Sequence, residues 1–82
     1  MVASRPTIVL QDVFLNQVRK EKTKVVVTFM DGETISGYVK GFDLYAIILE
    51  SDKRQLMLYK HSVSRIMPEI PVNFTPDRQR QV

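Results

Sequence analysis

The sequence contains no cysteine and a single histidine. Disulfide bridges are therefore excluded, and so is a zinc site of the usual kind, which gathers several cysteine or histidine ligands. The lack of cysteine fits a reducing compartment. We expect neither a metal ion nor any other cofactor.

Long apolar segments are also missing. None approaches the roughly 20 residues that a helix needs to cross a bilayer. Residues 1–6 are polar, unlike the apolar centre of a signal peptide. We therefore expect a cytoplasmic protein with no membrane partner.

A chain of 82 residues is expected to form one domain. Its core is thin, because a chain of this size buries only about 60–65% of its unfolded surface. The sequence has no internal repeat and no low-complexity segment. A small all-β domain without disulfide bridges often gains the missing burial by oligomerising.

The net charge of +3 is concentrated in one place. Residues 19–24, with the sequence RKEKTK, hold four basic residues and one acidic residue, so this patch accounts for the whole excess. A local basic patch favours contact with a polyanion. The alternative is a solvated helix end, because the helix dipole stabilises cations in a last turn without any partner.

Apolar residues with helical spacing predict one helix over about residues 9–20. They form a single stripe of Leu10, Phe14, Leu15 and Val18. Asp12 near the start and the basic residues near the end match the helix dipole. Residues 1–8 are expected to be a flexible lead.

From residue 24 the pattern is typical of β-strands. We expect them at about residues 24–31, 33–42, 44–51, 54–60 and 62–67. Asp31-Gly32 predicts a type I′ hairpin turn, which needs positive φ at both central residues. Polar and apolar residues alternate along residues 33–42, and the glycines on the apolar face indicate bends. Residues 45–49 and 56–58 are almost wholly apolar and are expected to be buried.

One helix followed by five short, strongly bent antiparallel strands is typical of a mainly β fold, the Sm-like or SH3-like barrel. The domain is expected to span residues 9–70. Residues 71–82 are expected to be a short disordered tail.

The single histidine, His61, follows Tyr59 and Lys60 at the end of an apolar strand. The set is poorly suited to catalysis, because no nucleophile is evident and no carboxylate adjoins the histidine. It is well suited to binding a phosphate and a base, with lysine as a point charge and histidine as a donor or stacking ring. The alternative is the ordinary chemistry of a strand end.

Several short motifs occur in a fixed order: LQDVFLN at 10–16, RKEK at 19–22, Gly37, GFD at 41–43 and YKH at 59–61. Together they resemble Hfq, the family of bacterial Sm-like RNA chaperones. The resemblance covers about residues 10–72. Each motif alone is modest, but their order and spacing are highly specific. Tyr-Lys-His is the hallmark that separates Hfq from other Sm-like proteins.

The resemblance implies a homohexameric ring, closed by pairing the fourth strand of one subunit with the fifth strand of the next. Uridine-rich RNA, including small regulatory RNA, would bind around a pore on the proximal face. The matching positions are Gln11, Leu44, Tyr45, Lys60 and His61. Tyr45 would stack on a base, while Lys60 and His61 would contact phosphate and ribose.

The resemblance also implies two further RNA sites. A rim site helps two RNAs to anneal, and its matching positions are Asn16, Arg19, Lys20, Lys22 and Phe42. A site on the opposite, distal face takes adenine-rich RNA. Its matching positions are Thr28, Met30, Asp31, Gly32, Glu33, Ile35, Ser36 and Gln55.

The sequence departs from the family pattern at some of these positions. Leu44 stands where many members carry an amide, Thr28 where many carry an aromatic residue, and Glu33 where an apolar residue is common. The negative charge of Glu33 opposes RNA, so the distal site is expected to be weakened. Lysine cannot reproduce the planar fork of arginine, so the rim is expected to give modest annealing.

Structural alternatives stand beside these roles. The alternative role of Tyr45 is that of a core residue. The alternative for Phe42 is a plug at a barrel corner, and the alternative for His61 is an ordinary turn residue. Asp43 is expected to be a structural residue of an Asx turn rather than a ligand.

Taken together, these features predict an RNA-binding chaperone of post-transcriptional regulation that is not an enzyme. One alternative is a scaffold ring for other proteins, in which RNA binding is incidental. Another is a ribonuclease that uses His61 and Lys60, but it would need a second acid–base group, which the sequence does not show.

Overall fold

The computed structural model describes residues 10–73 of the 82-residue chain. The predicted flexible lead, residues 1–8, and most of the predicted tail, residues 71–82, lie outside this range. The elements are α1 (Leu10–Lys20), β1 (Val25–Phe29), β2 (Thr34–Phe42), β3 (Ala46–Ser51), β4 (Arg54–Tyr59), the 3-10 helix η1 (Lys60–Ser62) and β5 (Val63–Pro68). Within residues 10–73, no helix is long and apolar enough to span a membrane.

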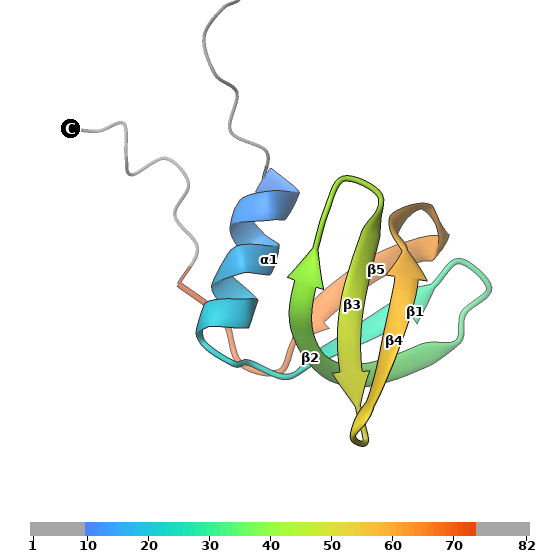
Figure 1. Ribbon diagram of the computed structural model, residues 1–82. Helices are drawn as coiled ribbons and strands as arrows, with labels where there is room; N and C mark the ends of the chain where they lie inside the picture. The colour runs from blue at the N-terminus through green and yellow to red at the C-terminus, as the bar shows by residue number, and fades with distance from the viewer. Residues whose placement is uncertain (1–9, 74–82) are drawn as a thin grey trace, which may run out of the picture.

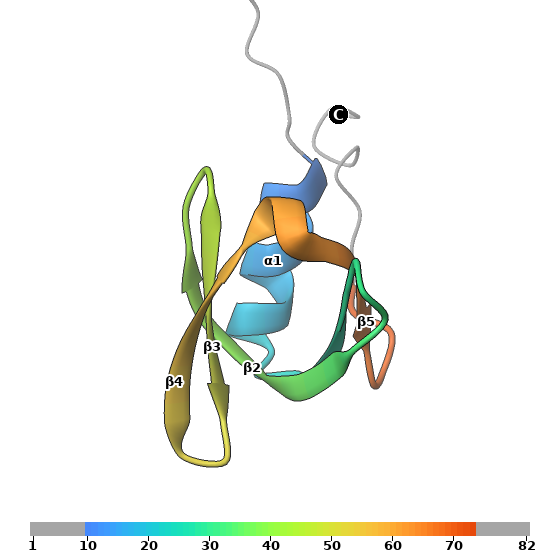
Figure 2. The same ribbon diagram turned by 90° about the vertical axis from the view of Figure 1, so that its right-hand side faces the viewer.

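The five strands form one antiparallel sheet in the order β4-β3-β2-β1-β5. The long strand β2 changes partner along its length, because Thr34–Gly37 pair with β1 whereas Tyr38–Phe42 pair with β3. Figure 2 shows the consequence: the sheet bends into two arms, with β3 and β4 in one arm and β1 and β5 in the other. The prediction of one helix and five bent antiparallel strands is confirmed. The sheet does not close into a barrel within one chain, so β4 and β5 remain its edges.

Gly37 lies where β2 changes partner. A Cβ at this position would collide with the carbonyl oxygen of Glu50 on β3. The missing side chain therefore lets the two strands approach closely at the bend. The pairing register shifts between Val39 and Gly41, and an irregularity of this kind increases the local twist.

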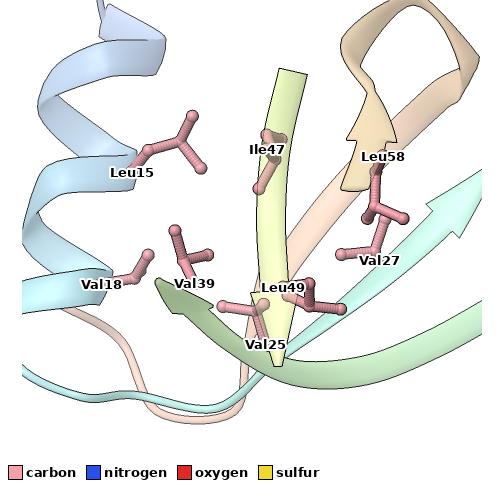
Figure 3. Close-up of a cluster of buried hydrophobic side chains, with 8 residues drawn as sticks. All are labelled: Leu15, Val18, Val25, Val27, Val39, Ile47, Leu49 and Leu58. Carbon is pink, nitrogen blue, oxygen red and sulfur yellow. The ribbon is translucent and has the colours of Figure 1, made fainter. Parts of the chain in front are cut away.

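The core fills the space between α1 and the inner face of the bent sheet. Its eight buried apolar side chains point toward one another in Figure 3: Leu15, Val18, Val25, Val27, Val39, Ile47, Leu49 and Leu58. The helix packs mainly against β2. It contributes Leu15 and Val18 from the predicted stripe, while Phe14 is only partly buried and Leu10 is 58% exposed.

Two apolar runs are less buried than predicted. In β4, Leu58 is buried but Met57 is 54% exposed, which is the alternation of an edge strand covered on one face. In β3, Ile47 and Leu49 are buried, whereas Ala46 and Ile48 are only partly covered. Both strands therefore direct one face to the core and leave the other largely open.

The type I′ turn lies in a different hairpin from the predicted one. Between β1 and β2, only Gly32 has a positive φ, of 95°. The N–H of Phe29 donates to the carbonyl of Glu33 at 2.8 Å, and the N–H of Gly32 donates to the carbonyl of Phe29 at 2.9 Å. This is a three-residue loop. The I′ conformation occurs between β3 and β4, where Asp52 and Lys53 have φ of 54° and 65°.

α1 ends in a Schellman motif, which fixes the backbone at the beginning of the basic patch, residues 19–24. Lys22 has a left-handed φ of 52°. Its N–H donates to the carbonyl of Arg19 at 3.2 Å, and the N–H of Thr23 donates to the carbonyl of Val18 at 3.0 Å. These bonds satisfy carbonyl groups of the last turn and turn the chain toward β1.

Candidate nucleic-acid interface

Three segments meet at one end of the molecule: the start of α1, the β2–β3 loop and the turn that follows β4 (Figure 1). They surround an open pocket of about 500 Å³. Its lining consists of Gln11, Leu44, Tyr45, Tyr59, Lys60 and His61. The fold thus brings together on one surface all five residues that were predicted to lie at the proximal pore.

The Tyr45 ring is held out of the core by the loop that precedes β3. The N–H groups of Tyr45 and Ala46 both donate to Oδ1 of Asp43, each at 2.9 Å. The expected Asx turn at Asp43 is therefore confirmed. Tyr45 itself is 72% exposed, so its alternative as a core residue is wrong, and its ring is available for stacking.

The same hydrogen bonds act on the charge of Asp43. They stabilise its carboxylate and lower the pKa of Asp43 below the ordinary value of 3.8, with the bond from Tyr45 contributing most and that from Ala46 next. The positive charge of Lys60 adds a smaller effect in the same direction. Asp43 is therefore a carboxylate that organises the loop.

The Lys60 side chain is only 17% exposed and lies between an acidic and an aromatic side chain. Its Nζ is 3.8 Å from Oδ1 of Asp12 and 5.7 Å from the centroid of the Phe42 ring. Its backbone N–H donates to the carbonyl of Tyr45 at 2.8 Å. These contacts anchor the cation and tie η1 to the β2–β3 loop.

The two rings next to Lys60 in sequence complete the pocket. The centroids of Tyr59 and His61 are 6.2 Å apart, and the ring planes are tilted by 47°. Tyr59 was predicted only as part of the Tyr-Lys-His motif and was not assigned to the pore site. The sequence signal for its exposure is the alternation of β4, because a buried Leu58 places the next side chain on the opposite, open face.

The pocket combines groups that suit an unpaired nucleotide. Exposed tyrosine rings can stack on a base, Lys60 can meet a phosphate, and the Gln11 amide offers both a donor and an acceptor. Leu44 is 72% exposed and adds apolar surface without a hydrogen-bonding group. Within residues 10–73, no cluster of histidine, cysteine or carboxylate side chains could hold a metal ion.

Four of the five predicted rim residues lie near the C-terminal end of α1. Nη2 of Arg19 donates to Oδ1 of Asn16 at 2.6 Å, and Lys20 and Lys22 are exposed nearby. Phe42 stands apart from them. Its ring is partly buried against the core and lies under Lys60, so the structure places it beside the pore pocket.

The predicted distal residues lie on and around the β1–β2 hairpin, with one exception. Met30, Asp31, Gly32 and Glu33 are exposed in its loop, and Thr28, Ile35 and Ser36 are half-buried on its strands. Gln55 lies on β4, which is separated from β1 by β3 and β2. A single chain therefore does not bring Gln55 to the other distal positions.

An N-terminal helix packed on a bent antiparallel sheet of five strands defines an Sm-like protein. A crystal structure described as that of the pleiotropic translational regulator Hfq matches this fold with a TM-score of 0.70. The two chains are 30% identical, and the match covers 72% of this chain and 98% of the other.

The model of the family described as Hfq protein matches residues 10–73. Proteins named RNA-binding protein Hfq are close in sequence. The one from Alkaliphilus metalliredigens is 49% identical, over 88% of this chain and 90% of the relative. The one from Desulforamulus reducens is 54% identical, over 85% of this chain and 88% of the relative. The chain belongs to the Hfq family, as its motifs predicted.

Proposed function

We propose that this protein is an RNA chaperone that works in the cytoplasm as a homohexameric ring and takes part in post-transcriptional regulation. Membership of the Hfq family and the names of its relatives support RNA binding. The observation that carries the proposal is the pocket in which Gln11, Tyr45 and the pair Lys60-His61 converge from three separate segments. Binding, rather than bond breaking, is its chemistry.

The pore pocket takes uridine-rich RNA, including the ends of small regulatory RNAs. Tyr45 stacks on a base, and the Asx turn fixes the backbone that carries its ring before the RNA arrives, which reduces the ordering cost of binding. Lys60 contacts a phosphate. The uracil edge carries one donor between two acceptors, and Gln11 and His61 supply complementary groups. Repetition around the ring gives successive nucleotides equivalent pockets.

The basic residues at the end of α1 serve the pairing of two RNAs. Arg19, fixed by its bond to Asn16, presents a planar guanidinium to a second strand, and Lys20 and Lys22 add charge. Holding one RNA at the pore and another across the rim raises their effective concentration for base pairing.

The distal face binds adenine-rich RNA more weakly than the pore binds uridine-rich RNA. Thr28 offers no ring to a purine. The exposed carboxylates of Asp31 and Glu33 stand on the hairpin loop and repel phosphate, most strongly at low salt.

The pore assignment is tested by titrating a short oligouridine, with oligoadenine as the comparison ligand. Tyr45→Ala and Lys60→Ala should each weaken oligouridine binding by about 1–3 kcal/mol. The matched control is Tyr38→Ala, which removes an exposed tyrosine away from the pocket and should leave this affinity unchanged. Native mass measurement checks the assembly. Parental affinity in both pore variants, with the assembly intact, would show that the pocket is not the oligouridine site.

A further inference from the structure

A second surface carries an exposed aromatic ring among cations. Tyr38 lies on the outer face of β2, since its neighbours Gly37 and Val39 are both buried, and it is 41% exposed. Tyr38 and Glu50 both border two hollows, of about 390 Å³ and 440 Å³. The two hollows are therefore parts of one groove, which we call the outer groove.

The outer groove runs from the end of α1 to the tip of the β3–β4 hairpin and is rich in positive charge. Its basic side chains are Arg19, Lys22 and Lys40 in the first hollow and Lys24 and Lys53 in the second. Only two carboxylates accompany these five cations, Glu50 and Asp52. Glu50 is already engaged, with Oε1 at 3.4 Å from Nζ of Lys40.

We infer that the outer groove binds single-stranded RNA, with the Tyr38 ring as a stacking platform and the lysines on either side as phosphate contacts. The inference rests on the proposed function, because the strand reaches the groove from the pore by way of the rim. Arg19 and Lys22 belong to both the rim and the groove, so positive charge continues without a gap from one to the other. An aromatic ring flanked by cations is the arrangement that holds unpaired nucleic acid without regard to sequence.

The lining favours a charged polymer over an apolar protein partner. Val39 is the only aliphatic side chain in it and is 3% exposed, so Tyr38 is the only exposed aromatic or aliphatic side chain of the lining. Protein interfaces have a larger apolar centre that is poor in charged residues. A chain of phosphates instead matches a row of lysines with one ring among them.

The test compares a short oligouridine, which fits the pore alone, with a long unstructured RNA that extends beyond the rim. Tyr38→Leu removes the ring and should weaken binding of the long RNA about tenfold, while short oligouridine binding stays at the parental value. Tyr38→Phe keeps the ring and should bind both RNAs like the parent.

Two substitutions of neighbouring basic residues give a second, independent measurement. Lys53→Gln should lower the slope of log affinity against log salt for the long RNA by about 0.7 for each groove that the RNA crosses, since this is the value for one phosphate contact on a single strand. Arg54→Gln is the matched control, because this exposed neighbour in the same hairpin lines neither hollow. It should leave the slope unchanged.

The outcomes separate the groove from the pore. If Tyr38→Leu binds the long RNA with the parental affinity, or loses affinity for both RNAs equally, the proposal that the outer groove binds RNA is wrong. Failure of the parent to bind short oligouridine, with long-RNA binding that depends on Tyr38, would overturn the pore and support the groove. Failure to bind either RNA would overturn both proposals.

Discussion

Asp43 shows how one exposed carboxylate controls the placement of a candidate RNA contact. It accepts two backbone N–H groups from the segment that carries Tyr45, and Lys60 lies close enough to act on its charge. These two bonds position the backbone that carries the Tyr45 ring. Hydrogen bonds to a charged acceptor are stronger than those to a neutral one, so the loop depends on the ionised form.

This dependence predicts an acid sensitivity. The folded-state pKa of Asp43 lies below 3.8, so the unfolded chain binds the proton more readily. The contribution to stability is complete above about pH 3.8 and is lost as the pH falls through the lower folded-state value. Asp43→Asn should lower the melting temperature at neutral pH and flatten its fall in acid, measured by thermal unfolding between neutral pH and pH 3. Asp52→Asn, in the exposed β3–β4 turn, is the control. Its melting temperature should fall in acid as that of the parent does.

At the scale of elements, the bend of β2 sets the shape of the molecule. The half of β2 before the bend belongs to one arm of the sheet and the half after it to the other. Gly37 stands at the junction with the Glu50 carbonyl against its Cα, whereas Gly41 has open space where a Cβ would lie. Two glycines of the same strand therefore have different requirements.

Alanine substitution should separate them. Gly37→Ala forces the new methyl group against backbone, which side-chain motion cannot relieve, and should destabilise the protein by about 1–3 kcal/mol. Gly41→Ala should change stability by no more than about 0.5 kcal/mol. Chemical denaturation of both variants measures the difference. Equal, small effects would mean that β2 and β3 can separate at the bend without cost.

The elements were predictable to different degrees. The helix and strands follow from the spacing of apolar residues, but the turns do not follow from dipeptide preferences. Asp31-Gly32 adopts a wider loop in which Oδ1 of Asp31 accepts the Glu33 N–H at 3.0 Å. Asp52-Lys53 contains no glycine and gives no such signal. The pairing of Ser51 with Arg54 leaves only two residues to connect the strands, which favours a type I′ or II′ turn. The positive φ of both residues is that of type I′.

The candidate sites were also predictable from the sequence to different degrees. The pore residues were predicted by a resemblance to a known pattern, since Gln11, Tyr45 and Lys60 are far apart in sequence. The outer groove could not be predicted, because it exists only where side chains from the end of α1, the outer face of β2 and the β3–β4 hairpin come together. Tyr38 alternates with buried residues like any exposed strand residue, and nothing in the sequence shows which cations surround it.

At the scale of the whole molecule, the sheet ends in two open edges. β4 and β5 each have a strand on one side only, and unpaired edge groups are a template for pairing with another chain. Both edges carry exposed apolar side chains: Met57 is 54% exposed on β4, and Met67 is 52% exposed on β5. In the proposed ring, β4 of one subunit pairs with β5 of the next, and a small core with two such edges would gain burial from this pairing.

Carboxylates at these edges should therefore prevent assembly. Met57→Asp and Met67→Asp each place a charge where the proposed ring excludes water, and an unpaired buried charge costs several kcal/mol. Native mass measurement should show monomers or open fragments in place of the ring. Met30→Asp makes the same exchange at a 70% exposed methionine in the β1–β2 loop, which is part of neither edge strand, and should assemble like the parent. Intact rings in both edge variants would mean that the subunits meet through other surfaces. Loss of assembly in Met30→Asp alone would place the contact at the β1–β2 hairpin instead.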